Sequence, residues 1–259
     1  MIKKVTFRNR RGQKMVGCFY FPKGKGPFPI IVHFHGLSIG KKTRSAGYFA
    51  KILPRLGFAY FVFDMTGHGE SDGKLEEVTP SKAAEDARAA VALAKKQNFV
   101  DKKRIGLFGS SYGGYAAIRV AANDPTIKTL VLKSPAVDYA EVRKFQIGDF
   151  GIAAWKKLDI MYVWHRKQEK GYILKYKFYQ DSLKNPGYKW APKIKASTLV
   201  VQGDRDSYVP IRQSKKLYDL LKAKTKRRVM IKDGDHKYKN PKHRARFNKL
   251  AIDWFKKYL

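Results

Sequence analysis

Residues 104–117, RIGLFGSSYGGYAA, decide the fold of this chain. They pass from an apolar, strand-like run through the pattern G-x-S-x-G into a helix-like run that begins at Tyr115. A serine on such a tight strand-to-helix turn holds a strained backbone and presents its hydroxyl at the edge of a sheet. Gly109 and Gly113 stand two positions away on each side of Ser111, whereas Ser110 has a phenylalanine in the first of these places. The stretch therefore predicts a nucleophile elbow with Ser111 as the nucleophile.

The bulk properties fit one large α/β domain, or one such domain carrying an insertion. The chain has 259 residues, of which 44% are hydrophobic, so it can bury a substantial core. Charge interrupts the first eight residues, and no apolar run approaches the length that spans a membrane. We expect a soluble, cytoplasmic protein that does not bind membranes. The single cysteine, Cys18, excludes an intrachain disulfide and is expected to be a packed thiol.

The net charge of +34 raises the question of nucleic-acid binding. Clustered Lys and Arg bind phosphate backbones by releasing counterions. In this chain the basic residues are scattered, being densest in 222–228 and 237–249, and no nucleic-acid-binding motif or repeated aromatic platform accompanies them. We expect a solvated basic surface without a specific nucleic-acid partner. Such a surface steers anionic substrates toward the protein at low salt.

Strand-like and helix-like runs alternate along most of the chain. The strand-like runs are Val5 to Arg8, Met15 to Phe21, Pro29 to Phe34, Phe58 to Phe63, Arg104 to Phe108, Thr129 to Leu132, Thr198 to Gln202 and Arg228 to Ile231. Helix-like runs lie at Ala46 to Leu56, Ser81 to Lys96, after Ser111 and at Ile211 to Leu221. The first two strands form an expected antiparallel hairpin. The alternation that follows predicts an α/β fold with a mostly parallel central sheet flanked by helices, and functional residues outside the carboxyl ends of its strands.

One segment, residues 138–190, departs from this alternation and is predicted to be an inserted cap. We expect a core domain of residues 1–137 and 191–259, with the cap as a long insertion without strands of its own. Its aromatic residues are Trp155, Tyr162, Trp164, Tyr172, Tyr176, Phe178, Tyr179, Tyr188 and Trp190. Most of them are expected to form the small core of the cap, and a few to line an apolar substrate pocket.

The chain offers a base and an acid for Ser111 in the order Ser, acid, His. A serine hydroxyl needs a histidine to take its proton, and that histidine needs an acid that orients it. His236 lies in the loop that follows the last strand-like run, whereas the other histidines lie in less suitable places. Asp204 and Asp206 both follow the buried run that ends at Gln202, and either could reach inward. The backbone N–H of Tyr112, after the nucleophile, is the first expected oxyanion donor.

The loop at residues 35–40, HGLSIG, is the expected source of the second oxyanion donor. Enzymes of this architecture take that donor from the loop after an early strand. The N–H of Leu37 is the simplest choice, because glycine beside it lets the chain turn its amide toward the pocket.

These motifs together resemble the α/β-hydrolase superfamily over nearly the whole chain. The matching motifs are GSSYGG at 109–114, His35-Gly36, GDRD at 203–206 followed by Val209-Pro210, and Gly234-Asp235-His236. In this family the last acid of G-x-x-D is commonly catalytic, which implies Asp206 rather than Asp204. The segment DMTGHGESDG, residues 64–73, is similar to a structural turn near the active-site mouth of these enzymes.

Within the superfamily, the resemblance is to compact feruloyl-type esterases that carry a small cap in the position of residues 138–190. It rests on the run through residues 73–76 and on to 85–87. It implies a serine esterase that cleaves carboxylic esters, feruloyl or short-acyl, through an acyl-enzyme. The partner is then a small-molecule ester, with no cofactor and no metal, and the oligomeric state stays open, a homodimer among the options.

Two alternatives remain at this point. The elbow is also similar to that of prolyl-oligopeptidase-type acyl peptidases, which implies a serine peptidase or amidase. A more remote alternative is a polyanion- or nucleic-acid-binding protein with a vestigial hydrolase site, which the charge of +34 motivates.

Overall fold

The computed structural model describes residues 1–165 and 170–259, and its centre is a mostly parallel sheet. In that part of the chain the sheet has eight strands, in the order β1-β2-β4-β3-β5-β6-β9-β10. The strands are β1 Ile2–Arg8, β2 Lys14–Tyr20, β3 Phe28–Phe34, β4 Ala59–Phe63, β5 Val100–Ser110, β6 Ile127–Lys133, β9 Ser197–Gly203 and β10 Lys226–Ile231. The pairs β1–β2 and β2–β4 are antiparallel, and the strands from β4 to β10 pair in parallel. The predicted fold class is confirmed.

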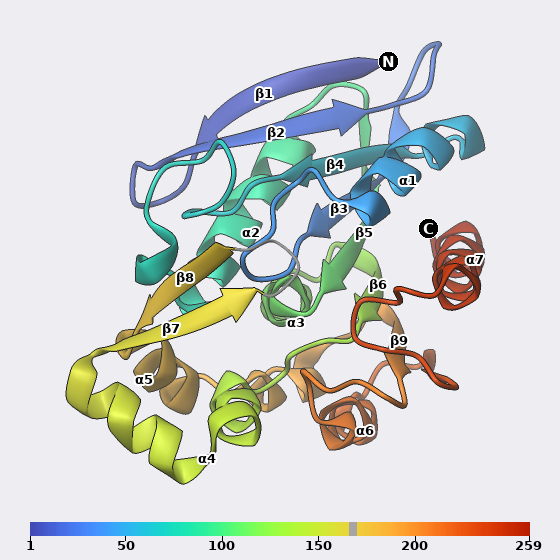
Figure 1. The fold of residues 1–259 in the computed structure, drawn as a ribbon. Helices are drawn as coiled ribbons and strands as arrows, with labels where there is room; N and C mark the ends of the chain where they lie inside the picture. The colour runs from blue at the N-terminus through green and yellow to red at the C-terminus, as the bar shows by residue number, and fades with distance from the viewer. Residues whose placement is uncertain (166–169) are drawn as a thin grey trace.

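Helices cover both faces of this sheet (Figure 1). They are α1 Arg44–Ile52, α2 Pro80–Lys95, α3 Tyr112–Asn123, α4 Tyr139–Leu158, α5 Lys177–Lys184, α6 Ile211–Leu220 and α7 Pro241–Tyr258, with short 3₁₀ turns at Pro54–Leu56, Leu75–Glu77, Gly187–Lys189 and Ala191–Lys193. Side-chain oxygens of Thr43, Thr79 and Asn240 cap α1, α2 and α7 by accepting from free backbone N–H groups of the first turn.

The two faces of the sheet carry separate apolar cores. Side chains of α2 and α3 pack on one face with Val32 of β3 and Leu107 of β5, while α1 and α7 pack on the other with Ile31 and Phe108. Successive residues of a strand point to opposite faces, so a strand covered on both faces must be apolar at every position. This explains the uninterrupted burial of β4.

The carboxyl ends of β5, β6, β9 and β10 lie next to one another in the strand order. The loops that follow these parallel strands therefore emerge at one edge of the sheet. These loops contain Ser111, Ser134, Asp206 and His236.

The segment between β6 and β9 contains strands, contrary to the expectation from the sequence. Between α4 and α5 it forms an antiparallel hairpin of β7, Ile160–His165, and β8, Lys170–Lys175, which is separate from the central sheet. Figure 1 shows this hairpin beside α4 and α5 on one side of the molecule. Each strand has only six residues, IMYVWH in β7 and KGYILK in β8, and an apolar run as short as that of β7 does not distinguish a strand from part of a helix.

Aromatic side chains of this segment pack together and against the core. Trp155 is 2% exposed, donates its indole N–H to the carbonyl oxygen of Leu174 at 2.9 Å, and faces Phe178. Phe178 in turn contacts the rings of Tyr139 and Tyr112. The side chain of Trp164 lies outside the described side chains.

Ion pairs tie the same segment to the core. Lys175 and Lys177 both pair with Glu77, which follows the turn at residues 64–73. Among the helices of residues 1–165 and 170–259, none combines the length and apolarity that crossing a membrane requires.

Candidate active site

Ser111 stands at the junction of β5 and α3 with a strained backbone. Its φ of 51° and ψ of −110° lie outside the regions that residues with a Cβ normally occupy. Such strain costs on the order of 1–3 kcal/mol and persists only where the surroundings hold it. Here the Ser111 N–H donates to Lys133 O at 3.0 Å, and Ala136 N–H donates to Ser111 O at 3.2 Å.

The two glycines around Ser111 lie where the chain leaves no space for a side chain. A Cβ on Gly109 would stand 2.5 Å from Gly113 O, and a Cβ on Gly113 would stand 2.0 Å from Phe34 O. The spacing G-x-S-x-G thus reflects close packing of the elbow against the end of β3.

Asp206 and His236 are in direct contact. His236 Nδ1 lies 2.8 Å and 3.0 Å from the two carboxylate oxygens of Asp206. The Asp206 side chain is fully buried and also accepts from the N–H groups of Tyr208 and Val209 and from the amide of Gln202. Asp204, the other acid that the sequence left open, is exposed.

The partners of Asp206 keep it ionised. Burial alone would raise the pKa of the Asp206 carboxyl, but the hydrogen bond and charge of His236, with the bonds from Val209 and Gln202, bring this pKa below its ordinary value. An ionised Asp206 can accept the Nδ1–H of His236, which leaves Nε2 of the neutral ring as a proton acceptor.

The segment after β6 contacts both the serine and the histidine loops. Lys133 O accepts from Ser111 N, while Lys133 Nζ lies 3.4 Å from Lys237 O. Ser134 Oγ donates to His236 O at 3.3 Å. Burial lowers the pKa of Lys133 to about 8. Two adjacent residues, Lys133 and Ser134, therefore contact both loops.

The loop that carries Leu37 is supported by two buried histidines. His35 donates Nδ1–H to Gly36 O at 2.8 Å and accepts from Met65 N at 3.0 Å. His68 accepts from Ser38 N at 3.1 Å and donates to the carbonyl of Thr66. Each ring uses one nitrogen as donor and the other as acceptor, which requires the neutral form.

Burial keeps these rings neutral. It lowers the pKa of His35 to about 3 and also lowers the pKa of His68. The turn at residues 64–73, which the sequence marked as structural, thereby braces the Leu37 loop through His68. The N–H of Tyr112, the first residue of α3, has no acceptor within the helix, and the next residue, Gly113, packs closely against His35 at the start of the same loop.

Two further residues near Ser111 carried no signal in the sequence. The ring of Tyr139, the first residue of α4, lies 5.6 Å from that of Tyr112, the residue after Ser111, and the Ser111 side chain is near enough to lower the pKa of the Tyr139 hydroxyl. Burial raises the pKa of Tyr139, which keeps this hydroxyl protonated. One turn further along α4 lies Arg143, which is only 5% exposed. In the sequence, only the position of Tyr139 and Arg143 after the carboxyl end of β6 could have indicated that they belong to the site.

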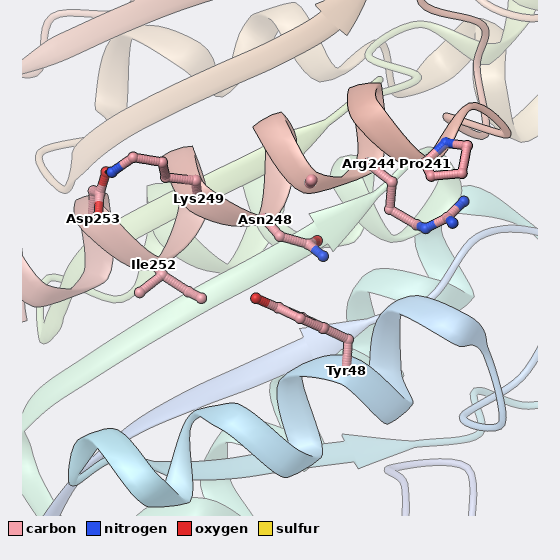
Figure 2. Close-up of a pocket in the computed structure, with 8 residues that line it drawn as sticks. Tyr48, Pro241, Arg244, Asn248, Lys249, Ile252 and Asp253 are labelled. Carbon is pink, nitrogen blue, oxygen red and sulfur yellow. The ribbon is translucent and has the colours of Figure 1, made fainter.

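A separate pocket of about 400 Å³ lies away from these residues. It is lined by Tyr48 of α1 and by residues of α7, including Arg244 and Asn248 (Figure 2). None of its lining residues is Ser111, Asp206 or His236. Within residues 1–165 and 170–259, no group of three or more His, Cys, Asp or Glu side chains is arranged to hold a metal ion.

Known proteins of similar sequence include bacterial and fungal relatives. An uncharacterised 31.7 kDa protein in the traX-finO intergenic region of Escherichia coli is 27% identical over 274 residues, with 93% of this chain and 95% of that protein covered. The thiohydrolase apmlB of Arthrinium phaeospermum is 30% identical over 144 residues, which cover 52% of this chain and 43% of that protein.

A solved structure and a family profile extend the comparison. Est1E from Butyrivibrio proteoclasticus with bound ferulic acid superimposes with a TM-score of 0.81 at 24% identity, covering 96% of this chain and 98% of that chain. The profile of the prolyl oligopeptidase family matches residues 46–259. With the parallel sheet and the elbow already described, these matches identify the fold. The chain is a hydrolase of the α/β-hydrolase superfamily and belongs to the prolyl oligopeptidase family.

Proposed function

We propose that this protein is a serine esterase that cleaves carboxylic esters through an acyl-enzyme on Ser111. The observation that supports it most is the strained backbone of Ser111 at the elbow, together with the buried Asp206–His236 pair on a neighbouring loop of the same sheet edge. Strained backbone of this kind is found most often at active sites.

In the proposed mechanism, His236 Nε2 takes the proton of Ser111 as the hydroxyl attacks the ester carbonyl. The charge that develops on the ring is stabilised by Asp206, which stays ionised. The N–H groups of Leu37 and Tyr112 are the proposed donors to the oxyanion, whose stabilisation is usually the largest single contribution to the rate. His236 then protonates the leaving alcohol, and water releases the acid by the reverse sequence.

The adjacent serines provide a matched test. Ser111→Ala should abolish hydrolysis of p-nitrophenyl butyrate and labelling by a fluorophosphonate probe, because it removes the proposed nucleophile. Ser110→Ala should keep both, since Ser110 ends β5 one residue before the turn. If circular dichroism shows that both variants are folded and Ser111→Ala keeps the wild-type turnover, Ser111 is not the nucleophile.

The comparisons favour a second candidate, a serine peptidase or amidase. The matched family is the prolyl oligopeptidase family, whose name denotes peptide hydrolysis. Rates on one N-acyl amino acid offered as p-nitrophenyl ester and as p-nitroanilide separate the two functions. The esterase proposal expects turnover of the ester to dominate, and a faster anilide reaction would favour the peptidase.

A separate comparison is needed to establish whether the leaving group of the substrate is an alcohol or a thiol. Relatives include proteins named thiohydrolases, and Est1E was solved with ferulic acid. A panel of one acyl group as oxygen ester and as thioester, beside methyl ferulate, ranks these substrate classes by kcat/KM.

A further inference from the structure

Arg143 is a buried cation without a carboxylate partner. It lies on α4, is 5% exposed, and makes one hydrogen bond, from Nη1 to Gln146 Oε1 at 2.8 Å. Its Nε is buried and has no acceptor. Among the described residues no Asp or Glu forms an ion pair with it. Of the five N–H groups that a guanidinium offers, one donates to Gln146 and the buried Nε–H has no acceptor.

A charge buried in this way is costly unless an anion accompanies it. Ionised groups in protein interiors are almost always paired or hydrogen-bonded, because removal from water penalises them strongly. Phe178 offers the Arg143 guanidinium an aromatic face 5.4 Å away, which compensates only in part. The missing partner is therefore expected to arrive from outside the chain.

The position of Arg143 relative to Ser111 indicates which molecule supplies the missing anion. Four residues before it on the same helix face is Tyr139, whose ring contacts that of Phe178, which Arg143 also faces, and lies 5.6 Å from the ring of Tyr112, the residue after Ser111. The charge of Arg143 also lowers the pKa of Tyr139. A group that fills the space beside the guanidinium is thus within one helical turn of the proposed nucleophile.

On its other side, Arg143 is linked to the histidine loop. Gln146 accepts from Arg143 and donates to Tyr208 O at 3.0 Å, and the ring of Tyr208 lies 5.2 Å from that of His236. The guanidinium therefore belongs to the wall of the proposed active site.

We propose that Arg143 binds a carboxylate carried by the substrate, so that the natural substrate is an ester with a second, ionised acid group. The inference rests on the proposed esterase function and names the substrate class of that site. Arg suits this task because its planar fork bonds both carboxylate oxygens at once. The carboxylate takes no part in the chemistry: one monoanionic half-ester and one water give a dicarboxylate, an alcohol and one proton.

The overall charge fits this substrate class. A protein with a net charge of +34 attracts small anions to its surface and raises their rate of encounter at low ionic strength. The surface would then bring an anionic ester to the molecule, and Arg143 would hold it beside Ser111.

The test compares two esters of the same shape. Monoethyl glutarate and ethyl pentanoate differ only in a terminal carboxylate against a methyl group, and a pH-stat at pH 7.5 follows both. We expect the wild type to have the higher kcat/KM for the glutarate half-ester. Arg143→Met should lower the ratio of the two kcat/KM values by about tenfold to a hundredfold, the usual range for one lost hydrogen-bonded charge.

Arg119→Met is the matched control. Arg119 also has a buried Nε without an acceptor and stacks on a tryptophan, Trp190, at 4.3 Å, but it lies two turns along α3 from Ser111. The proposal expects Arg119→Met to keep the wild-type ratio. A ratio unchanged in Arg143→Met, or lowered equally in both variants, overturns it.

A binding measurement on the unaltered protein keeps the test independent of folding of the variants. Glutarate should inhibit hydrolysis of ethyl pentanoate at least tenfold more strongly than pentanoate does, and equal inhibition overturns the proposal. Loss of activity on both esters in Ser111→Ala supports the esterase itself, so failure of the Arg143 inference and failure of the proposed function give different results. A merely structural Arg143 would lower the melting temperature in Arg143→Met without moving the ratio.

Discussion

Gly113→Ala should damage both stability and activity, because the elbow has no space for one more carbon. A Cβ at this position would stand 2.0 Å from Phe34 O and 2.7 Å from His35 O, both backbone atoms. That is about 1.5 Å inside the optimal separation of ~3.5 Å, so either α3 or the end of β3 must move. The end of β3 leads directly into the loop that carries Leu37.

The size of the effect follows from two opposing contributions. Alanine in place of glycine within a helix is favourable by about 1 kcal/mol. Overpacking against fixed backbone costs about 1–3 kcal/mol and sometimes more. Because a 2.0 Å approach to fixed backbone belongs at the upper end of this range, we expect net destabilisation of about 2 kcal/mol. Displacement of an oxyanion donor by about 1 Å is expected to lower kcat/KM by roughly a hundredfold.

Gly47→Ala provides the matched control for this substitution. Gly47 lies within α1 and is exposed, and a Cβ there would have no atom within 4 Å. We expect the free energy of unfolding of this variant to be about 1 kcal/mol higher than that of the wild type, and its activity to be unchanged. Urea denaturation measures the stability of both variants, and hydrolysis of p-nitrophenyl butyrate measures their kcat/KM. If Gly113→Ala is as stable as Gly47→Ala and as active as the wild type, the steric reasoning is refuted.

Two further predictions concern the buried ionisable groups. Because the pKa of His35 is about 3 in the folded protein and about 6.5 when unfolded, only the unfolded chain takes up this proton between these values. The contribution of neutral His35 to the free energy of unfolding is therefore complete above pH 6.5. It falls by about 2.5 kcal/mol between pH 7 and 4.5. Urea denaturation at both pH values should show a smaller loss in His35→Gln, and an equal loss would contradict the neutral ring. Asp206→Asn should lower kcat by roughly 10⁴-fold, because the ring tautomer of His236 is no longer fixed, with little change in the melting temperature; kcat within tenfold of the wild type would remove Asp206 from the mechanism.

The sequence by itself determined the sheet and the order of the elbow, acid and histidine loops. These signals are local: a strand covered on both faces must be apolar throughout, as in β4, and an elbow needs glycine two positions on each side of Ser111. The hairpin of β7 and β8 was missed, because its strands have only six residues each and a short apolar run such as that of β7 does not distinguish a strand from part of a helix.

What only the tertiary structure decided depends on distance through space. Asp206 rather than Asp204 contacts His236, because burial and two backbone N–H donors hold its carboxylate while Asp204 faces solvent. Tyr139 follows Ser111 by 28 residues and comes to lie against its neighbour Tyr112, with Arg143 one turn further along the helix, only because α4 begins just after the carboxyl end of β6. Sequence spacing encodes contacts along one element, whereas a buried charge without a partner appears only when separate elements are packed together.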